Sequence, residues 1–376
     1  MKKLSLFLMS FMLIMTSCTK QQEEATESAK FEIKRGVNLS HWLSQSEVRG
    51  EERAKHIDEG DIKRLKEFGF DHVRIPIDEE QFWDEEGNKQ PEAWQLLTST
   101  LDNCQKHDLR AIVDLHIIRS HYFNAVNEGQ ANTLFTDSVA QEQLIDMWKQ
   151  LSDSLNRYPT SLVAYEFMNE PVADDPDQWN QLIAKVHKAL RGLEPERTLV
   201  IGSNLWQSVG TFKDLKVPEN DSNLILSFHY YEPFVLTHYT AWWTPVGKYT
   251  GKVEYPGAMI SKEEFDNQPD SIKGQIERYT QEWNKDTLKA QIQDAIDVAK
   301  KYNLQLICGE WGYFEKSPKE QSLRWAKDMI TVFDEDNLAW DLWCYDGDFG
   351  FWNPDDSGFK DEEMLKVIMS GKKLGE

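Results

Sequence analysis

The chain has 376 residues and a formal net charge of −22, with 64 acidic and 42 basic side chains. This acidic excess, without clustered Lys and Arg, argues against nucleic acid or an anionic membrane as partner and disfavours acidic polysaccharides. Cys104, Cys308 and Cys344 fit neither a disulfide framework nor a zinc motif, and they are expected to be small buried side chains.

The first residues have the features of an export signal. Lys2 and Lys3 precede a short apolar stretch, Leu4–Met15, which cannot span a bilayer as a stable helix. Cys18 closes this stretch, and the pattern resembles a bacterial lipoprotein signal whose cysteine is lipidated after cleavage. An ordinary secretory signal with an incidental cysteine is the alternative. The predicted units are a signal at 1–18, a polar tether at 19–30 and one folded domain at 31–376.

The lipoprotein pattern predicts export and attachment to a bacterial membrane, facing the periplasm or the cell surface. The lipid on Cys18 is the only membrane contact expected, because no later segment is apolar enough to cross a bilayer.

Eight apolar, strand-like runs follow. Most are separated by segments with helical periodicity; Ile62, Leu65 and Phe68, for example, end at the stop signal Gly69. Eight strands alternating with helices predict a single-domain (β/α)8 barrel. A doubly wound sheet is the rival, but no Gly-rich phosphate loop follows the first run. The runs are Ile33–Leu39, His72–Ile77, Ala111–Leu115, Val163–Met168, Leu199–Gly202, Leu224–Phe228, Leu304–Cys308 and Leu338–Cys344.

Polar and aromatic side chains recur where these runs end. The C-terminal ends of barrel strands form one mouth, so we expect these side chains to meet there. They are Arg74, His116 after Asp114, Asn169-Glu170, Asn204, His229-Tyr230-Tyr231, Glu310 and Trp343.

Glu170 and Glu310 stand out among them, because each follows a buried run and they lie far apart in sequence. Two facing carboxyl groups are what glycoside hydrolysis needs: one protonates the leaving oxygen and the other attacks the sugar or activates water. We expect the two groups roughly 5 Å apart, which is the retaining spacing, whereas roughly 8 Å would favour inversion.

These motifs, in this order, resemble glycoside hydrolase family 5, the large family of retaining cellulases, mannanases and exo-glucanases. The resemblance covers nearly the whole chain after the signal. It implies a (β/α)8 barrel, retention of anomeric configuration and no cofactor or metal. The motifs are Val73-Arg74-Ile75-Pro76, Asp114-Leu115-His116, Asn169-Glu170-Pro171, His229-x-Tyr231, Glu310 and Trp343.

The resemblance also implies a role for each site residue. Glu170 would be the acid/base and Glu310 the nucleophile. Asn169 would hydrogen-bond the 2-hydroxyl of the sugar under attack, and Trp343 would be the floor on which that sugar stacks. The remaining four would complete the site: Tyr231 and Arg74 by orienting Glu310, and His116 and His229 by hydrogen bonding around the sugar.

Two long connections bear on the substrate. The segment from Tyr230 to about Trp283 and the segment Ile117–Asn127 exceed ordinary strand-to-helix loops. The chain has 14 Trp, and a minority are expected to stack on sugar rings. The aromatic residues predicted to supply platforms in the longer segment are Tyr231, Phe234, Tyr239, Trp242, Trp243 and Tyr249.

The substrate predicted is a β-linked polysaccharide or oligosaccharide, cleaved by an endo-β-1,4-glucanase-like enzyme. The opening Gly36-Val37-Asn38-Leu39 also resembles exo-β-1,3-glucanases, which stay an alternative together with β-mannanases. A carbohydrate-binding protein without catalysis and a metal-dependent barrel hydrolase are alternatives of other classes. The first would have lost a carboxylate, and the second commonly has an HxH pair after the first strand, which is absent from this sequence.

Overall fold

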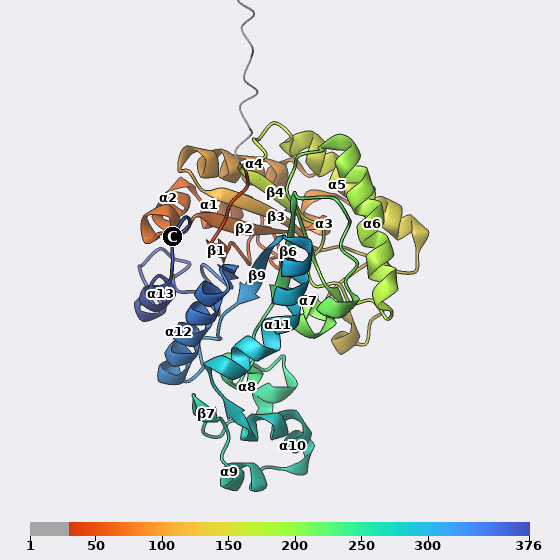
Figure 1. Ribbon diagram of the computed structural model, residues 1–376. Coiled ribbons are helices and arrows are strands. Elements are labelled where there is room, and N and C mark those ends of the chain that lie inside the picture. The colour runs from red at the N-terminus through yellow and green to blue at the C-terminus, as the bar shows by residue number, and fades with distance from the viewer. Residues whose placement is uncertain (1–29) are drawn as a thin grey trace, which may run out of the picture.

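The computed structural model describes residues 30–376 and shows a closed barrel of eight parallel strands wrapped by helices (Figure 1). The predicted (β/α)8 fold is therefore confirmed. The predicted signal, Cys18 and the tether up to residue 29 lie outside the described residues. The barrel strands, in spatial order, are β1 (Arg35–Asn38), β10 (Ala339–Leu342), β9 (Gln305–Trp311), β6 (Leu224–His229), β5 (Leu199–Gly202), β4 (Val163–Glu166), β3 (Arg110–Ile117) and β2 (His72–Asp78).

The helices follow the predicted periodicity, and their apolar faces pack on the outside of the barrel. The connection between β5 and β6 differs, because it holds only the short α7 (Asn204–Gln207) and the 3-10 turn η2 (Val209–Asp214). The remaining helices are α1 (Gly50–His56), α2 (Glu59–Phe68), α3 (Glu79–Phe82), α4 (Pro91–Lys106), α5 (Ser138–Leu155), α6 (Pro176–Leu193), α8 (Phe234–Thr237), α9 (Lys262–Asp266), α10 (Asp270–Ile276), α11 (Lys285–Tyr302), α12 (Lys319–Glu335) and α13 (Glu362–Ile368).

Helix α2 shows how the local sequence sets these boundaries. Asp58 caps its start by accepting hydrogen bonds from the backbone of Gly60 and Asp61, and the Asp61 carboxylate accepts from the Asp58 backbone N–H. Gly69 ends the helix in the left-handed conformation, with φ of 100°, as its position in the sequence predicted.

The barrel interior has an apolar layer toward the N-terminal ends of the strands and a polar layer toward their C-terminal ends. Ile112 and Ala164 belong to the apolar layer, while Asp114 and Glu166, two residues further along the same strands, are buried in the polar layer. Alternate residues of a strand share one face, so each strand supplies both layers. The polar layer lies toward the C-terminal ends of the strands, below the mouth where the site is expected.

The long segment between β6 and β9 is a small lobe rather than an irregular loop. It holds α8, α9 and α10 and a two-stranded antiparallel sheet, β7 (Gly257–Ala258) with β8 (Glu282–Trp283). The lobe extends below the barrel in Figure 1, coloured green to cyan. Among the described residues, none of the helices combines the length and the hydrophobicity that a membrane span requires.

Candidate active site

Glu170 and Glu310 face each other at the C-terminal mouth of the barrel. One carboxylate oxygen of each lies within 4.8 Å of the other, and His229 contributes a ring nitrogen within the same distance. This separation agrees with the roughly 5 Å expected for a retaining pair and not with the wider inverting spacing. Glu310 lies within β9, whereas Glu170 follows β4 by four residues and has a left-handed backbone with φ of 44°.

Arg74 organises the charges beneath this pair. Its Nη1 donates to Glu310 Oε1 at 2.9 Å, and its Nε donates to Glu166 Oε2 at 2.7 Å. Its Nη2 donates to Asn169 Oδ1 at 2.9 Å and lies 3.0 Å from Asp114 Oδ2. The guanidinium is fully buried, so its planar set of donors fixes several acceptors in one arrangement.

The surroundings of Glu170 and Glu310 affect the pKa values of the two carboxyl groups differently. Burial raises the pKa of Glu170 well above its usual range, and the charge of Glu310 raises it further. Burial also raises the pKa of Glu310, but Arg74 opposes that shift and Tyr231 donates to its Oε2 at 3.0 Å. The pair shares its protons, and these donors favour the charge on Glu310 and the proton on Glu170.

Two histidines complete the polar rim. His229 Nδ1 lies 2.9 Å from Glu170 Oε1 and 3.5 Å from Glu310 Oε2. Burial lowers the pKa of His229 well below its ordinary value, so the ring is neutral. Burial likewise lowers the pKa of His116 to about 4, and its Nδ1 lies 2.7 Å from Asp114 Oδ2.

Trp343 lies beside His116, with ring centroids 5.7 Å apart and planes within 10°. His41 meets the same indole edge-on at 6.0 Å, so the ring is supported from two directions. The structure thus brings together all eight residues named from the sequence: Arg74, His116, Asn169, Glu170, His229, Tyr231, Glu310 and Trp343.

Three residues that the sequence did not single out join this network. Asn38 accepts from Arg74 Nη1 at 2.9 Å, and Glu166 holds the other side of the guanidinium. Gln207 accepts from the Glu170 backbone N–H at 3.0 Å and donates to Glu166 Oε1 at 3.1 Å. Glu166 could have been predicted from the sequence, because an acidic residue inside an apolar strand needs a buried cation as its partner.

Other expected positions serve different purposes. Asn204 exchanges hydrogen bonds with the Ala173 backbone and not with Glu170 or Glu310. Tyr249 was wrongly predicted as a sugar platform: it is buried and packs in the main hydrophobic core. By contrast, Trp242 is 86% exposed and meets Trp243 edge-on at 5.7 Å. Cys104, Cys308 and Cys344 are buried and unpaired, as predicted.

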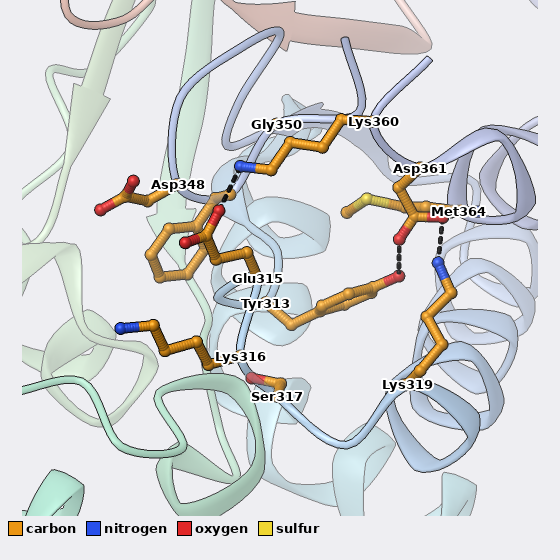
Figure 2. Close-up of a pocket in the computed structure, with 11 residues that line it drawn as sticks. Tyr313, Glu315, Lys316, Ser317, Lys319, Asp348, Gly350, Lys360, Asp361 and Met364 are labelled. Carbon is orange, nitrogen blue, oxygen red and sulfur yellow. Dashed lines mark hydrogen bonds and ion pairs between the residues drawn. The ribbon is translucent and has the colours of Figure 1, made fainter. Parts of the chain in front are cut away.

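A hollow of about 390 Å³ lies along the same rim, between the loops that follow β9 and β10 (Figure 2). Figure 2 shows Lys360 reaching Glu315, and Tyr313 reaching Asp361, across this hollow. Phe349 lines it and also packs in one aromatic cluster with Trp343 and Phe314. The hollow therefore adjoins Trp343, and neither Glu170 nor Glu310 lines it.

Glu170, His229 and Glu310 could in principle hold a metal ion. Arg74 already places a positive charge 2.9 Å from Glu310, and a second cation there would be repelled. The donor set fits an acid and a carboxylate nucleophile better than a metal centre.

Comparisons with known proteins agree with this geometry. The family described as Cellulase (glycosyl hydrolase family 5) matches residues 27–348. Endoglucanase C of Acetivibrio thermocellus is 31% identical over 347 residues, covering 90% of this chain and 99% of that protein. Cellodextrinase A of Ruminococcus flavefaciens is 28% identical, covering 82% of this chain and 84% of that protein. The crystal structure of endoglucanase Cel5A from Thermotoga maritima shares the fold, with a TM-score of 0.71 and 22% identity, covering 89% of this chain and 96% of that one.

Proposed function

The chain belongs to glycosyl hydrolase family 5, and on that premise we propose that Glu170 and Glu310 cleave a β-glucan by double displacement. The protein is a glycoside hydrolase, and the assignment of roles follows from the charges around the two groups. Glu310, held by Arg74 and Tyr231, is the nucleophile. Glu170, buried and facing that negative charge, keeps the proton that the leaving oxygen needs.

In the first step Glu310 attacks the anomeric carbon. The bond to the leaving sugar breaks as Glu170 passes its proton to the departing oxygen, and a glycosyl ester forms on Glu310. Esterification removes the negative charge of Glu310, so the pKa of Glu170 falls and Glu170 becomes a base. In the second step Glu170 takes a proton from water, which attacks the anomeric carbon and releases Glu310.

The other site residues bind and orient the reacting sugar. Trp343 offers a flat face on which the ring stacks. Asn169, held by Arg74, presents its amide to the 2-hydroxyl, where a hydrogen bond strengthens toward the transition state. Neutral His116 and His229 hydrogen-bond without adding charge beside the nucleophile.

The substrate we propose is a β-1,4-glucan cleaved internally, as the names endoglucanase and cellodextrinase of the relatives suggest. The hollow beside Phe349 and the exposed Trp242 and Trp243 would accommodate further sugar units along the same rim. The observation that carries the proposal is the close, differently charged pair formed by Glu170 and Glu310.

Product analysis tests both parts of the proposal. Proton NMR of fresh products should show the β-anomer first, and chromatography should show internal shortening of β-1,4-glucan in preference to β-1,3-glucan and mannan. Initial release of the α-anomer would contradict double displacement. Monosaccharide release alone, or preference for another polymer, would replace the proposed mode or substrate while leaving the acid and nucleophile in place.

We propose further that the protein is exported and held at a bacterial membrane by a lipid on Cys18. The support is the basic start, the short apolar stretch Leu4–Met15 and the polar segment after the cysteine. Radiolabelled palmitate should be incorporated into the wild type and not into Cys18→Ala. Equal labelling of both proteins, or of neither, would contradict the lipid anchor.

A further inference from the structure

The turn after β5, at Asn204–Gln207, is hydrogen-bonded to the segment after β4 that contains Glu170. Leu205, Trp206 and Gln207 have successive φ values of 52°, 61° and 51°, a left-handed run that non-glycine residues rarely adopt. Such a run persists only where surrounding contacts determine it, and it often marks a functional site. Four hydrogen bonds join this turn to Glu170–Ala173: Glu170 N to Gln207 Oε1 (3.0 Å), Trp206 N to Pro171 O (3.2 Å), Ala173 N to Asn204 Oδ1 (2.9 Å) and Asn204 Nδ2 to Ala173 O (2.8 Å).

Gln207 is the member of this turn that reaches the reaction centre. Its side chain is fully buried, and both ends of its amide are used. The oxygen accepts from the backbone of Glu170, and the nitrogen donates to Glu166, which in turn accepts from Arg74 at 2.7 Å. Arg74 is bonded to Glu310, so one chain of contacts links the backbone of one catalytic glutamate to the carboxylate of the other.

The fold leaves space for this amide. A Cβ atom at Gly202 would lie 2.4 Å from Gln207 Cγ, which is too close for any side chain. Glu170 itself has φ of 44°, a conformation that is costly for a glutamate and needs an external support. The Gln207 oxygen is the hydrogen-bond acceptor that the structure gives to the Glu170 backbone N–H.

We propose that Gln207 is a positioning residue for the acid/base: it holds the left-handed backbone of Glu170 so that the carboxyl group meets the leaving oxygen. This inference rests on the acid/base role proposed for Glu170. Without the carboxamide, the carboxyl group would lose its alignment with the leaving group, whereas Glu310 would keep its contacts with Arg74 and Tyr231. Protonation of the leaving group would then suffer more than nucleophilic attack.

Two aryl glycosides that differ only in the leaving group separate these effects. The 2,4-dinitrophenolate of 2,4-dinitrophenyl β-cellobioside departs without protonation, whereas the phenolate of phenyl β-cellobioside needs a proton to depart. The quantity compared is the ratio of kcat/KM for the first substrate to that for the second. Glu170→Gln should raise this ratio by about 100-fold or more, and Gln207→Met by about 10-fold.

Gln81→Met is the matched control, because Gln81 is equally buried and its amide also bonds at both ends, to Arg53 and to the Ser46 backbone. It should leave the ratio within a factor of about 2 of the wild type. A general loss of folding would lower both rates in either variant and leave the ratio unchanged.

Gln207→Glu tests the same idea even where Gln207→Met does not fold. Below about pH 5 the new carboxyl group holds its proton, so it can accept from Glu170 N–H and donate to Glu166 as the amide does. The ratio should then equal that of the wild type at the same pH, and it should rise above the wild-type ratio at higher pH as the new group ionises beside Glu166.

An unchanged ratio in Gln207→Met, or a ratio in Gln207→Glu that follows the wild-type ratio at every pH, would overturn the positioning role alone if Glu170→Gln behaves as expected. An unchanged ratio in Glu170→Gln would instead overturn the acid/base assignment and, with it, the role of Gln207.

Discussion

Arg74 carries the only cationic side chain that the described structure places against both Glu166 and Glu310. Burial raises the pKa of Glu166 and of Asp114 to about 7, and in both cases Arg74 opposes the shift. The site therefore concentrates more acidic groups than its single guanidinium can neutralise. Burial first, and then this surplus of negative charge, raises the pKa of Glu170, the carboxyl group with the fewest donors around it.

The first prediction concerns the pH profile of Glu170. Its pKa is raised, so the acid form persists at pH values where an ordinary carboxyl group is ionised, and activity should fall as pH rises through that raised pKa. Glu170→Gln should slow glucan hydrolysis by about 10²- to 10⁴-fold, and the activity that remains on an activated aryl glycoside should lack this alkaline decline.

Glu254→Gln is the control for this profile, because Glu254 lies on the lobe and pairs there with Lys252. Its profile should match that of the wild type. If the alkaline decline survived in Glu170→Gln, another group would have to be the acid.

At the scale of elements, the barrel mouth collects residues from distant strands, and this made much of the site predictable. Glu310 and Arg74 lie on strands whose apolar runs are plain in the sequence, and parallel strands bring their C-terminal ends together. Gln207 was not predictable, because its position depends on a left-handed run in Leu205–Gln207 that lacks the Gly or Asn usual there. The sequence predicts a long loop where the lobe lies, because the helices of the lobe are too short to show clear periodicity.

The second prediction concerns the lobe. Trp242 and Trp243 extend an aromatic series that passes through Phe314 and Phe349, and Phe349 also lines the hollow beside Trp343. Replacing Trp242 with Ala should raise KM for long cello-oligosaccharides by about 2- to 10-fold, the range of one aromatic contact, and leave kcat nearly unchanged.

If Trp242 binds only the outer sugars, cellobiosides, which offer two sugar units, should react with Trp242→Ala as with the wild type. Leu193→Ala removes another exposed apolar side chain, at the end of α6 that leads into β5 and therefore away from the mouth, and it serves as the control. An equal effect of Trp242→Ala on short and long substrates would show that the lobe does not bind the outer sugars.

For the whole molecule, one buried ion cluster links stability to pH. His72 Nδ1 lies 2.6 Å from Asp71 Oδ1, and its Nε2 lies 2.8 Å from Asp341 Oδ1, so the ring joins β2 to β10 across β1. Burial opposes the charge on His72, but the two aspartates outweigh it and raise the pKa to about 9. Gly36 leaves the room for this contact, because a Cβ atom there would lie 1.8 Å from Asp341 Oδ1.

The third prediction follows from that raised pKa. His72 binds its proton more tightly in the folded state than in the unfolded state. It therefore stabilises the fold fully below its unfolded pKa, near 6.5, and this stabilisation is lost as pH rises through the folded pKa of about 9. The gap corresponds to about 3 kcal/mol in the free energy of unfolding. The difference in stability between wild type and His72→Gln, from urea unfolding, should be largest near pH 6 and shrink toward pH 10.

His187→Gln provides the comparison, because His187 pairs with Asp221 at a partly exposed position. It should change stability less than His72→Gln does at pH 6. A His72→Gln difference that stayed constant from pH 6 to pH 10 would show that the imidazole does not carry the charge.

The central claim is that Glu310 becomes bonded to the sugar. A 2-deoxy-2-fluoro-β-cellobioside with a 2,4-dinitrophenyl leaving group should trap this ester, because fluorine slows its hydrolysis. Mass spectrometry of a protease digest should find the added fluoroglycosyl group on the peptide that contains Glu310. A label on Glu170, on any other residue or on none during inactivation would contradict the mechanism.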